Sequence, residues 1–393
     1  MQKCDIAVIG GGASGLVCAV RLKELDKNLS VVIIEKGERA GKKIAASGNG
    51  QGNVSNVDLG AEHYHGSCAF LAEKLCSSRL YDPLEMFDFL FTADRLGRIY
   101  PAGKQGSALS DCLLRKVEKL GIELKLSTAV TAIEKGFTLS LSNGEKLLAD
   151  RIVLAAGGKA QKQFGTDGGG YELAKSLGHT VTPLYPSLVQ IKCDTRHIKT
   201  LKGIRTECCV TVLGKDDKIL GSSTGDVIFT DYGVSGNAVF YVSAYCAGAD
   251  GVTLSLEFLP DVPGERIAED VENKLKKGYQ QSELLYGTLH NQVGRAVMKR
   301  CESSDPKTVA RAVKNFTLAA EGTLGFDYAQ VTKGGVPASE VDESLQSKIV
   351  RGLYLTGEVL DVDGDCGGYN LTWAIVSGMH AAKCIANSFN TDD

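Results

Sequence analysis

A glycine-rich turn near the start of the chain constrains the fold more than any other feature. Asp5 to Ile9 are mostly apolar and β-branched, which predicts a buried strand, and Gly10 to Gly15 then read Gly-Gly-Gly-Ala-Ser-Gly. Leu16 to Leu22 continue with helical apolar spacing, and a second buried strand, Val31 to Ile34, ends at Glu35. This order of strand, GxGxxG turn, helix, strand and acid predicts a βαβ unit that binds an adenine dinucleotide.

Each residue of this fingerprint has a physical task. Gly10 permits the tight turn, Gly12 lets the backbone approach a pyrophosphate, and Gly15 allows the helix to pack closely on the strand. The first amides of the helix then face the phosphates. Glu35 is placed to accept hydrogen bonds from ribose hydroxyls, which favours a cofactor with a free 2′-OH such as FAD or NAD. The alternative is a tight βα turn that binds nothing.

The N-terminal half continues with a loop and more strands. Gly41 to Asn53 look like a glycine-rich loop with two adjacent lysines, which suits phosphate or a flavin edge; a plain surface loop is the alternative. Ala129 to Ile133 and Leu139 to Leu141 predict a hairpin, and Arg151 to Ala156 predict another buried strand.

The sequence changes character from about Pro186. Arg266 to Lys277 and Thr308 to Ala320 look helical, Gly352 to Glu358 resemble a buried strand again, and Leu371 to Ala386 have helical spacing. We therefore expect an α/β domain built from both ends of the chain and interrupted by a small antiparallel sheet or barrel. The strands predicted for that insert are Cys208 to Leu213, Val227 to Phe229, Ala238 to Val242 and Val252 to Phe258.

Composition excludes several classes of protein. The net charge of −3 shows no basic excess, so we expect no nucleic-acid partner. No apolar run is long enough for a membrane span, the start does not look like a secretory signal, and the 12 cysteines include no CxxC pair. These features predict a soluble cytoplasmic protein with no membrane partner. The six histidines show no ligand spacing apart from His63-x-His65, so we expect no metal site.

Motifs spread over the whole chain resemble those of the aminoacetone-oxidase-like family of FAD-binding enzymes. These are also described as NAD(P)/FAD-dependent oxidoreductases, and some members reduce bile-acid intermediates. The resemblance rests on GGGASG, Glu35-Lys36, KKIAASGNGQGNVSN, RIYP, LAAGGKA and GTDGGGY in the first half of the chain. It continues with PSL, FTDYGVSGNA, TKGGV and the long C-terminal block GEVLDVDGDCGGYNL.

The resemblance implies a fold and a set of domain boundaries. The fold is a discontinuous, Rossmann-type two-dinucleotide-binding FAD domain with an inserted antiparallel β-barrel and a small helical subdomain. The expected FAD domain comprises residues 1–188 and 335–393. The β-barrel or substrate domain comprises 189–262 and 316–334, and the helical subdomain comprises 263–315.

The resemblance also implies where FAD binds. The fingerprint residues would hold the pyrophosphate, the Glu35 region the ribose, and Val130 the adenine, with the C-terminal block along the ribityl chain and the flavin ring. From the residues themselves, the glycines that open the last helix would aim its free amides at the flavin pyrimidine. The alternative is that these glycines only allow a close contact between the helix and the sheet. The expected cofactor-binding residues are Gly10, Gly12, Ala13, Ser14, Gly15, Glu35, Lys36, Lys42, Gly48, Asn53, Val130, Ala156, Gly157, Gly357, Glu358, Asp361, Gly368, Tyr369, Asn370 and Leu371.

Some positions depart from the family pattern. We expect these departures to change the substrate pocket and to leave FAD binding intact. Gly48 to Asn53 lack the Arg and Cys of GxGRCN, and Thr230-Asp231 replace Thr-His. This chain has Asn237 where the family has Pro, Thr372 where Gln is common, and Gln105 where Lys is usual.

Candidate catalytic residues are few, and no catalytic acid or base is assigned. Asp231, Tyr232 and Tyr369 are candidates only because their motifs should lie near the flavin. Cys366 is interpreted as a small packing residue rather than a redox thiol, and the vicinal Cys208 and Cys209 as structural.

The leading hypothesis is an FAD-dependent oxidoreductase that acts on a small organic substrate by flavin hydride transfer. NAD(P)H would bind transiently as the reductant, because only one dinucleotide fingerprint is present. The alternatives are an oxygen-using amine oxidase of the aminoacetone type and a non-catalytic flavin redox sensor. An RNA-modifying flavoenzyme is disfavoured by the charge. The substrate, the choice between NADH and NADPH, and the oligomeric state stay open.

Overall fold

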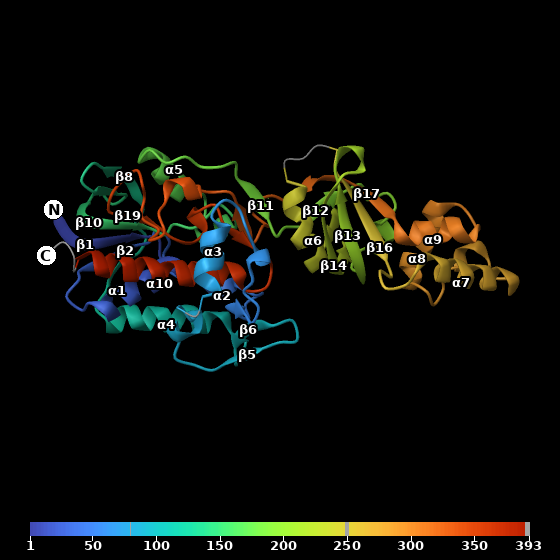
Figure 1. Cartoon of the computed structure of the whole chain (residues 1–393), viewed down its shortest axis with the longest axis horizontal. Helices are drawn as coiled ribbons and strands as arrows, with labels where there is room; N and C mark the ends of the chain where they lie inside the picture. The colour runs from blue at the N-terminus through green and yellow to red at the C-terminus, as the bar shows by residue number, and fades with distance from the viewer. Residues whose placement is uncertain (79, 248–250, 390–393) are drawn as a thin grey trace. The chain divides into compact units, whose positions relative to one another are not determined.

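The computed structural model describes residues 1–78, 80–247 and 251–389. The chain divides into two compact units (Figure 1). The first, the FAD-type unit, comprises Met1–Leu184 and Val331–Asp393, and the second, the barrel unit, comprises Tyr185–Gln330. Each unit has its own core of buried apolar residues. A mixed α/β unit and a closed antiparallel barrel confirm the predicted fold class.

The central sheet of the FAD-type unit is parallel over most of its width. Its strands run in the order β7-β2-β1-β10, and β10 also pairs with β19, all in parallel. Strand β2 and the last four residues of β1 are buried throughout, as expected for parallel strands covered on both faces. The bounds are β1 Gln2–Ile9, β2 Val31–Ile34, β7 Glu123–Lys125, β10 Lys146–Leu154 and β19 Leu353–Leu355.

An antiparallel hairpin completes this sheet beyond β10. Strand β9, Thr138–Leu141, pairs with the first half of β10 and with β8, Val130–Glu134. The turn between β8 and β9 contains Gly136 at φ +82°. The predicted hairpin is therefore present, one residue from its expected bounds.

Three long helices of the FAD-type unit pack together, with α1 contacting both α10 and α4 (Figure 1). A Cβ on Gly378 of α10 would lie 2.5 Å from the carbonyl oxygen of Ser14 in α1, so the contact of the two helices requires glycine there. The helices are α1 Ala13–Leu25, α2 Lys42–Ala46, α3 Ala69–Cys76, α4 Gly106–Lys119, α5 Gly169–Ser176 and α10 Tyr369–Phe389.

The FAD-type unit also contains short strands outside the central sheet. Strand β6 pairs with β3 and β5, and β20 pairs antiparallel with β4. Their bounds are β3 Ser55–Asn56, β4 Tyr64–His65, β5 Phe91–Ala93, β6 Arg98–Pro101, β18 Val331–Lys333 and β20 Asp363–Gly364.

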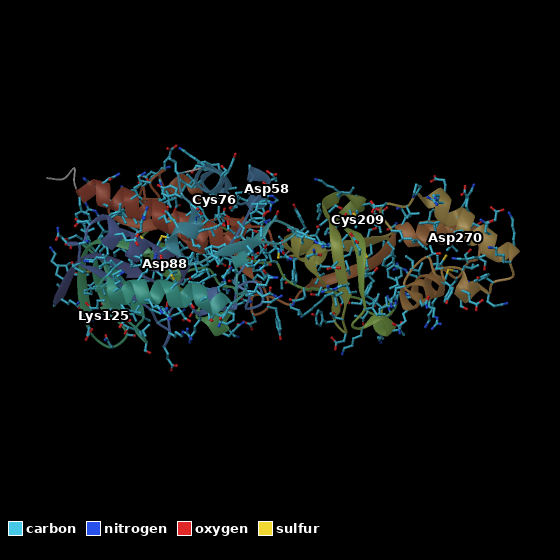
Figure 2. The ribbon with its side chains drawn as sticks, turned by 90° about the horizontal axis from the view of Figure 1, so that it is seen from below. Asp58, Cys76, Asp88, Lys125, Cys209 and Asp270 are labelled. Atoms are coloured by element: carbon cyan, nitrogen blue, oxygen red, sulfur yellow. The ribbon has the colours of Figure 1, made fainter. Side chains whose placement is uncertain are left out.

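The barrel unit contains a closed barrel in the order β12-β15-β14-β13-β16-β17, and all of its pairings are antiparallel. Side chains alternate along β13: Cys208 is buried, whereas Cys209 faces outward with its Sγ 3.2 Å from Ser222 Oγ (Figure 2). The bounds are β12 Ile191–Cys193, β13 Arg205–Leu213, β14 Ile219–Phe229, β15 Gly233–Ser235, β16 Thr253–Phe258 and β17 Phe316–Thr323.

The barrel unit also contains the helices α6 to α9 and the strand β11. Asp270 of α7 accepts hydrogen bonds from Lys274 Nζ and Thr288 Oγ1, both at 2.6 Å, and so holds the segment after α7 (Figure 2). The elements are β11 Tyr185–Ser187, α6 Asn237–Val242, α7 Gly264–Lys276, α8 Asn291–Cys301 and α9 Pro306–Lys314.

Three local predictions were wrong. Ala238 to Val242 form helix α6 rather than a strand, because Gly236 at φ +108° turns the chain out of β15. The helix predicted for Thr308 to Ala320 ends at Lys314, and β17 begins at Phe316 with alternating burial. The predicted loop from Gly41 to Asn53 contains the short helix α2, which starts after Gly41 at φ +75°.

In the part of the chain that the structure describes, no helix combines the length and the apolar character needed to cross a membrane.

Candidate functional site

The glycine turn joins β1 to α1 as the fingerprint predicts. Gly10 has φ +110°, and its amide donates to the carbonyl oxygen of Ile34 at 2.9 Å. A Cβ on Gly15 would lie 2.0 Å from the Gly10 oxygen, so only glycine fits there. A Cβ on Gly12 would meet no atom of the described residues within 4 Å. The backbone at Gly12 is therefore open to a ligand, beside the unpaired first amides of α1.

Glu35 lies against this turn at the end of β2. Its Oε2 accepts from the Gly11 amide at 2.7 Å, and its Oε1 accepts from the Gly37 amide at 2.7 Å. A carboxylate has about four acceptor positions, so roughly two remain for ribose hydroxyls. The Glu35 carbonyl also accepts from the Thr128 amide at 3.0 Å, and this contact brings the segment that leads to Val130 beside the acid.

Glu358 joins three segments that lie far apart in the sequence. Its Oε2 pairs with Lys43 Nζ at 2.9 Å, and its Oε1 accepts from the Thr332 amide at 2.8 Å. Thr332 Oγ1 in turn accepts from the amides of Lys159 at 2.8 Å and Ala160 at 3.1 Å. Lys43 and Glu358 are only 27% and 18% exposed, so their mutual attraction is screened less than that of a surface pair. The TKGGV motif contains Thr332, but nothing in the sequence indicates that Thr332 connects Glu358 to the segment at Lys159 and Ala160.

Lys36 binds Asp167 rather than standing free. The two side chains are 2.5 Å apart, and Asp167 also accepts from the Gly169 amide at 3.0 Å. Partial burial acts to raise the pKa of Asp167, but the Lys36 ammonium and the Gly169 amide outweigh it and lower that pKa. Lys36 therefore links the segment that follows β2 to the segment that precedes α5.

The C-terminal block forms a tightly packed loop ahead of α10. Gly368 has φ +107°, and a Cβ there would lie 2.3 Å from the Ser55 oxygen. Asn370 Oδ1 accepts from the Gly364 amide at 2.8 Å, and Asn370 Nδ2 donates to the Gly364 oxygen at 2.7 Å. Asp361 accepts from Ser67 Oγ at 2.8 Å. Asn370 and Asp361 thus hold the loop itself, a task that the sequence did not indicate.

The remaining predicted cofactor residues occupy the same unit in varied settings. Asn53 donates to the Ser55 and Ile99 oxygens, at 3.1 and 3.2 Å, and fixes the end of the glycine-rich loop. Ser14 lies against Gly357, where a Cβ would come within 2.8 Å of its Oγ. The residues among these that are partly or largely exposed, and so accessible to a ligand, are Ala13, Lys42, Gly48, Val130, Ala156, Gly157 and Leu371.

The candidate catalytic residues differ in their exposure and in their contacts. Asp231 pairs with Lys202 at 2.7 Å, and both side chains are exposed. Burial raises the pKa of Tyr232. Tyr369 is buried at 4% exposure, with its ring stacked on His63. Burial also raises the pKa of the Cys366 thiol, which favours the packing role predicted for it.

Two histidines and an aspartate form a cluster that sequence reasoning did not find. His63 and His65 both contact the carboxylate of Asp365, at 3.0 Å each. The available signal was the His-x-His spacing together with the alternating acids of the DVDGD segment. Neither pattern is diagnostic without the pairing of β4 with β20.

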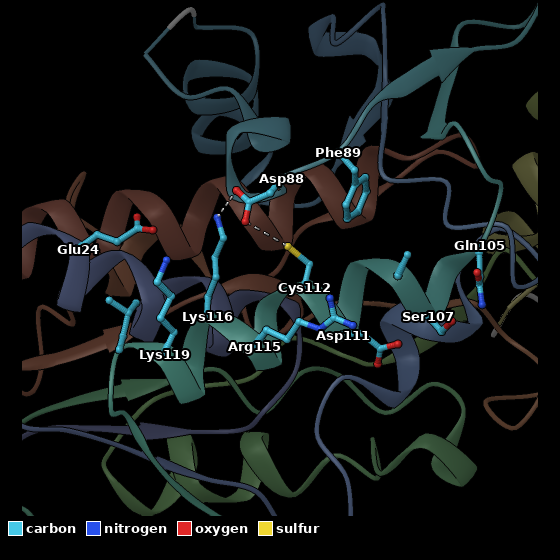
Figure 3. Close-up of a pocket in the computed structure, with 12 residues that line it drawn as sticks. Glu24, Asp88, Phe89, Gln105, Ser107, Asp111, Cys112, Arg115, Lys116 and Lys119 are labelled. Atoms are coloured by element: carbon cyan, nitrogen blue, oxygen red, sulfur yellow. Dashed lines mark hydrogen bonds and ion pairs between the residues drawn. The ribbon is translucent and has the colours of Figure 1, made fainter.

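Two cavities lie elsewhere. The larger, of about 600 Å³, runs along α4 (Figure 3). Two of its carboxylates are already paired, Asp88 with Lys116 at 3.1 Å and Asp111 with Arg39 at 2.8 Å. The smaller, of about 300 Å³, is lined by residues of the barrel unit that include Tyr286. Neither cavity is lined by a predicted cofactor-binding residue, so neither is the candidate site.

The parallel sheet, the βαβ turn and the acid at the end of β2 define a Rossmann-type dinucleotide-binding protein. A family model described as the HI0933-like protein Rossmann domain matches residues 4–384. The chain belongs to this family, which confirms the resemblance to FAD-binding oxidoreductases seen in the sequence, and it is an enzyme of that class.

Named relatives cover nearly the whole chain. A 3-dehydro-bile acid delta(4,6)-reductase of Clostridium scindens is 36% identical over 97% of this chain and 98% of its own length. A ribosomal RNA dihydrouridine synthase of Escherichia coli is 28% identical over 98% of each chain. Among solved structures, quinol-fumarate reductase with menaquinol molecules has a TM-score of 0.52 at 16% identity. The match covers 100% of this chain and 72% of that one, and it supports the fold alone.

Proposed function

We propose that the FAD-type unit binds FAD with the pyrophosphate over Gly12 and the adenosine ribose at Glu35. Three features of the structure support the fit. The space above Gly12 is open, Glu35 retains acceptor capacity, and the buried Thr356 Oγ1 beside Gly357 has no partner within the described chain. An orphaned hydroxyl of this kind is expected where a ligand supplies the missing partner.

We further propose that the enzyme reduces a carbon–carbon double bond conjugated to a carbonyl group in a small organic molecule. The observation that carries this proposal is the 36% identity to a delta(4,6)-reductase over almost the full chain. The second relative supports the same chemistry, because a dihydrouridine is a uridine with two hydrogens added across its double bond. Two relatives with one type of reaction favour a reductase over the oxygen-using amine oxidase.

The residues of this chain would hold the cofactor, and the cofactor would supply hydride transfer. Lys42 would bring positive charge to a segment beside the proposed phosphate position, whereas Lys36 and Lys43 are paired with Asp167 and Glu358. Glu358 fixes Lys43 and ties it to Thr332, so this side of the site is held by a charged pair rather than by a free lysine. We infer that NAD(P)H binds transiently as the electron source, because the chain has one dinucleotide fingerprint.

An RNA substrate is the second candidate, favoured by the dihydrouridine synthase relative. The net charge of −3 weighs against it, because nucleic-acid binding draws most of its affinity from cationic side chains. A steroid-like substrate requires no such charge. The two candidates differ in whether added salt weakens binding steeply.

The test is an anaerobic flavin spectrum. The protein is loaded with FAD, reduced with NADPH or NADH, and then mixed with a 3-oxo-4,6-diene steroid acid or with a uridine-containing RNA. Bleaching of the flavin band by the nicotinamide, and its return with the steroid, is the expected result. A reduced flavin that returns only with oxygen favours the oxidase. A flavin that no nicotinamide reduces favours the redox sensor, and a protein that binds no FAD contradicts the proposal.

A further inference from the structure

The carboxylate of Asp365 is held between two imidazole rings. Strand β4, which ends at His65, pairs with β20, and the Asp365 amide donates to the His63 oxygen at 2.9 Å. Asp365 Oδ2 lies 3.0 Å from His63 Nδ1, and Oδ1 lies 3.0 Å from His65 Nε2. Because Asp365 is only 17% exposed, both contacts are largely shielded from water.

This cluster is attached to the loop ahead of α10, which the family resemblance places along the flavin ring. The His63 ring stacks on the Tyr369 ring, with centroids 4.2 Å apart and planes 20° apart. Asn370 Nδ2 donates to the Asp365 oxygen at 3.2 Å. Tyr369 and Asn370 are the first residues of α10, so the cluster and the start of that helix form one packed assembly.

His65 is the member of the cluster that can meet a ligand. Its side chain is 44% exposed, against 22% for His63. Its Nε2 is used by Asp365, and its Nδ1 has no hydrogen-bond partner in the described part of the chain. His63 is occupied on both sides, with Nδ1 at Asp365 and Nε2 3.5 Å from Asp58, a residue that Figure 2 labels.

The charges around His65 favour its protonated form. The hydrogen bond to Asp365 raises the pKa of His65, and the charges of Asp365 and Asp363 act in the same direction. Partial burial and Lys333 oppose this effect without reversing it. A raised pKa widens the pH range over which His65 carries the proton that a general acid must donate.

We propose that His65 is the general acid of the reduction and that Asp365 and His63 are its positioning residues. This inference rests on the proposed function. The bound flavin would supply the hydride for the carbon of the conjugated double bond that lies farther from the carbonyl. His65 Nδ1 donates a proton to the other carbon of that bond, which is bonded directly to the carbonyl carbon. One carbon–carbon π bond breaks, and two carbon–hydrogen bonds form. His65 is left neutral and takes its next proton from solvent.

The kinetic test separates the two half-reactions of the FAD-loaded enzyme. In His65→Gln, flavin reduction by the nicotinamide should stay within about twofold of wild type. Reoxidation by the 3-oxo-4,6-diene steroid acid should slow by roughly 10²- to 10⁴-fold, the usual contribution of a general acid. His290→Gln, at an exposed position in the barrel unit, is the control and should change neither rate. Equal loss of both half-reactions in His65→Gln, or no loss in reoxidation, would overturn the proposal.

A second measurement needs no turnover. Proton NMR of the histidine Cε1–H signals, in protein free of cofactor, should give His65 a pKa above its ordinary value. Asp365→Asn should lower that pKa and move the fall of the reoxidation rate to lower pH, because the group loses its proton earlier. An unshifted His65 titration in Asp365→Asn contradicts the positioning role. A wild-type enzyme that the steroid fails to reoxidise contradicts the proposed function itself, whatever the histidine variants do.

Discussion

Helices α1 and α10 both begin after glycines, but the space around the two starts differs. At α1, a side chain on Gly12 would enter open space in the described structure, and Gly12 has an ordinary extended backbone at φ −82°. At α10, a side chain on Gly368 would strike the Ser55 oxygen, and its φ of +107° excludes most other residues. The space around the start of α1 is therefore open, whereas the start of α10 is closely packed against the backbone of Ser55.

The difference teaches that a glycine-rich helix start is not by itself an anion site. Glycines that leave a cavity point to a ligand, whereas glycines whose side-chain space is filled by backbone point to close packing. The polar groups near α10 are also committed, since Asn370 binds Gly364 and Asp365 binds two histidines. Substitutions at and around these glycines should therefore separate the two situations.

The largest effect is expected from Gly15→Ala. The added Cβ would lie 2.0 Å from the Gly10 oxygen in the turn that closes the fingerprint, and neither backbone can move without breaking the contact of β1 with α1. We expect a loss of about 3 kcal/mol or more in the free energy of unfolding. Chemical denaturation measures it, with Gly264→Ala as a control at an open helix start. A midpoint equal to that of the control would show that the turn is looser than this geometry implies.

Gly368→Ala should be the next most damaging change. It adds a clash at 2.3 Å with the Ser55 oxygen to a positive φ, and we expect a loss of about 2 kcal/mol or more in the free energy of unfolding. Gly322→Ala is the matched control, because Gly322 has φ +109° and an added Cβ there would meet no described atom within 4 Å. The difference between the two variants isolates the clash from the backbone strain. Equal losses of unfolding free energy in the two variants would mean that the start of α10 is not closely packed against Ser55.

Glu35→Gln should act on FAD more than on folding. The amide keeps the shape of the side chain but removes the charge and replaces one acceptor with a donor near the Gly11 and Gly37 amides. We expect FAD affinity to fall about 10- to 100-fold, as for the loss of a charged hydrogen bond. Isothermal titration of FAD into the cofactor-free protein measures it. Glu38→Gln, at an exposed position three residues further on, should bind FAD as wild type does; equal affinity in both variants would place the ribose elsewhere.

Much of the FAD-type unit could be predicted from local sequence. Strands β1 and β2 are short runs of buried apolar residues, and the GxGxxG turn permits one backbone path only, so pattern and structure agree there. The barrel unit was harder. Ala238 to Val242 have strand-like composition, yet they form α6 because the turn at Gly236 and the packing of the helix on β14 outweigh local preference.

The residues of the candidate site also fall into two groups, those that a local motif predicts and those whose contacts join distant segments. Gly10, Gly15 and Glu35 contact residues within the βαβ unit, so a local motif could predict them. The ion pair of Lys43 with Glu358 and the cluster of His65 with Asp365 join residues about 300 positions apart in the sequence. Such contacts depend on how distant segments pack, and a single sequence carries no direct signal for them.

The most direct test of the open site at α1 is Gly12→Ala, studied for stability and FAD affinity together. The Cβ enters open space at an allowed backbone conformation, so the free energy of unfolding of the cofactor-free protein should change by no more than about 0.5 kcal/mol. The same Cβ should occupy the position proposed for the pyrophosphate and raise the Kd for FAD by roughly tenfold or more. A stable variant that binds FAD as tightly as wild type would contradict this placement of the cofactor.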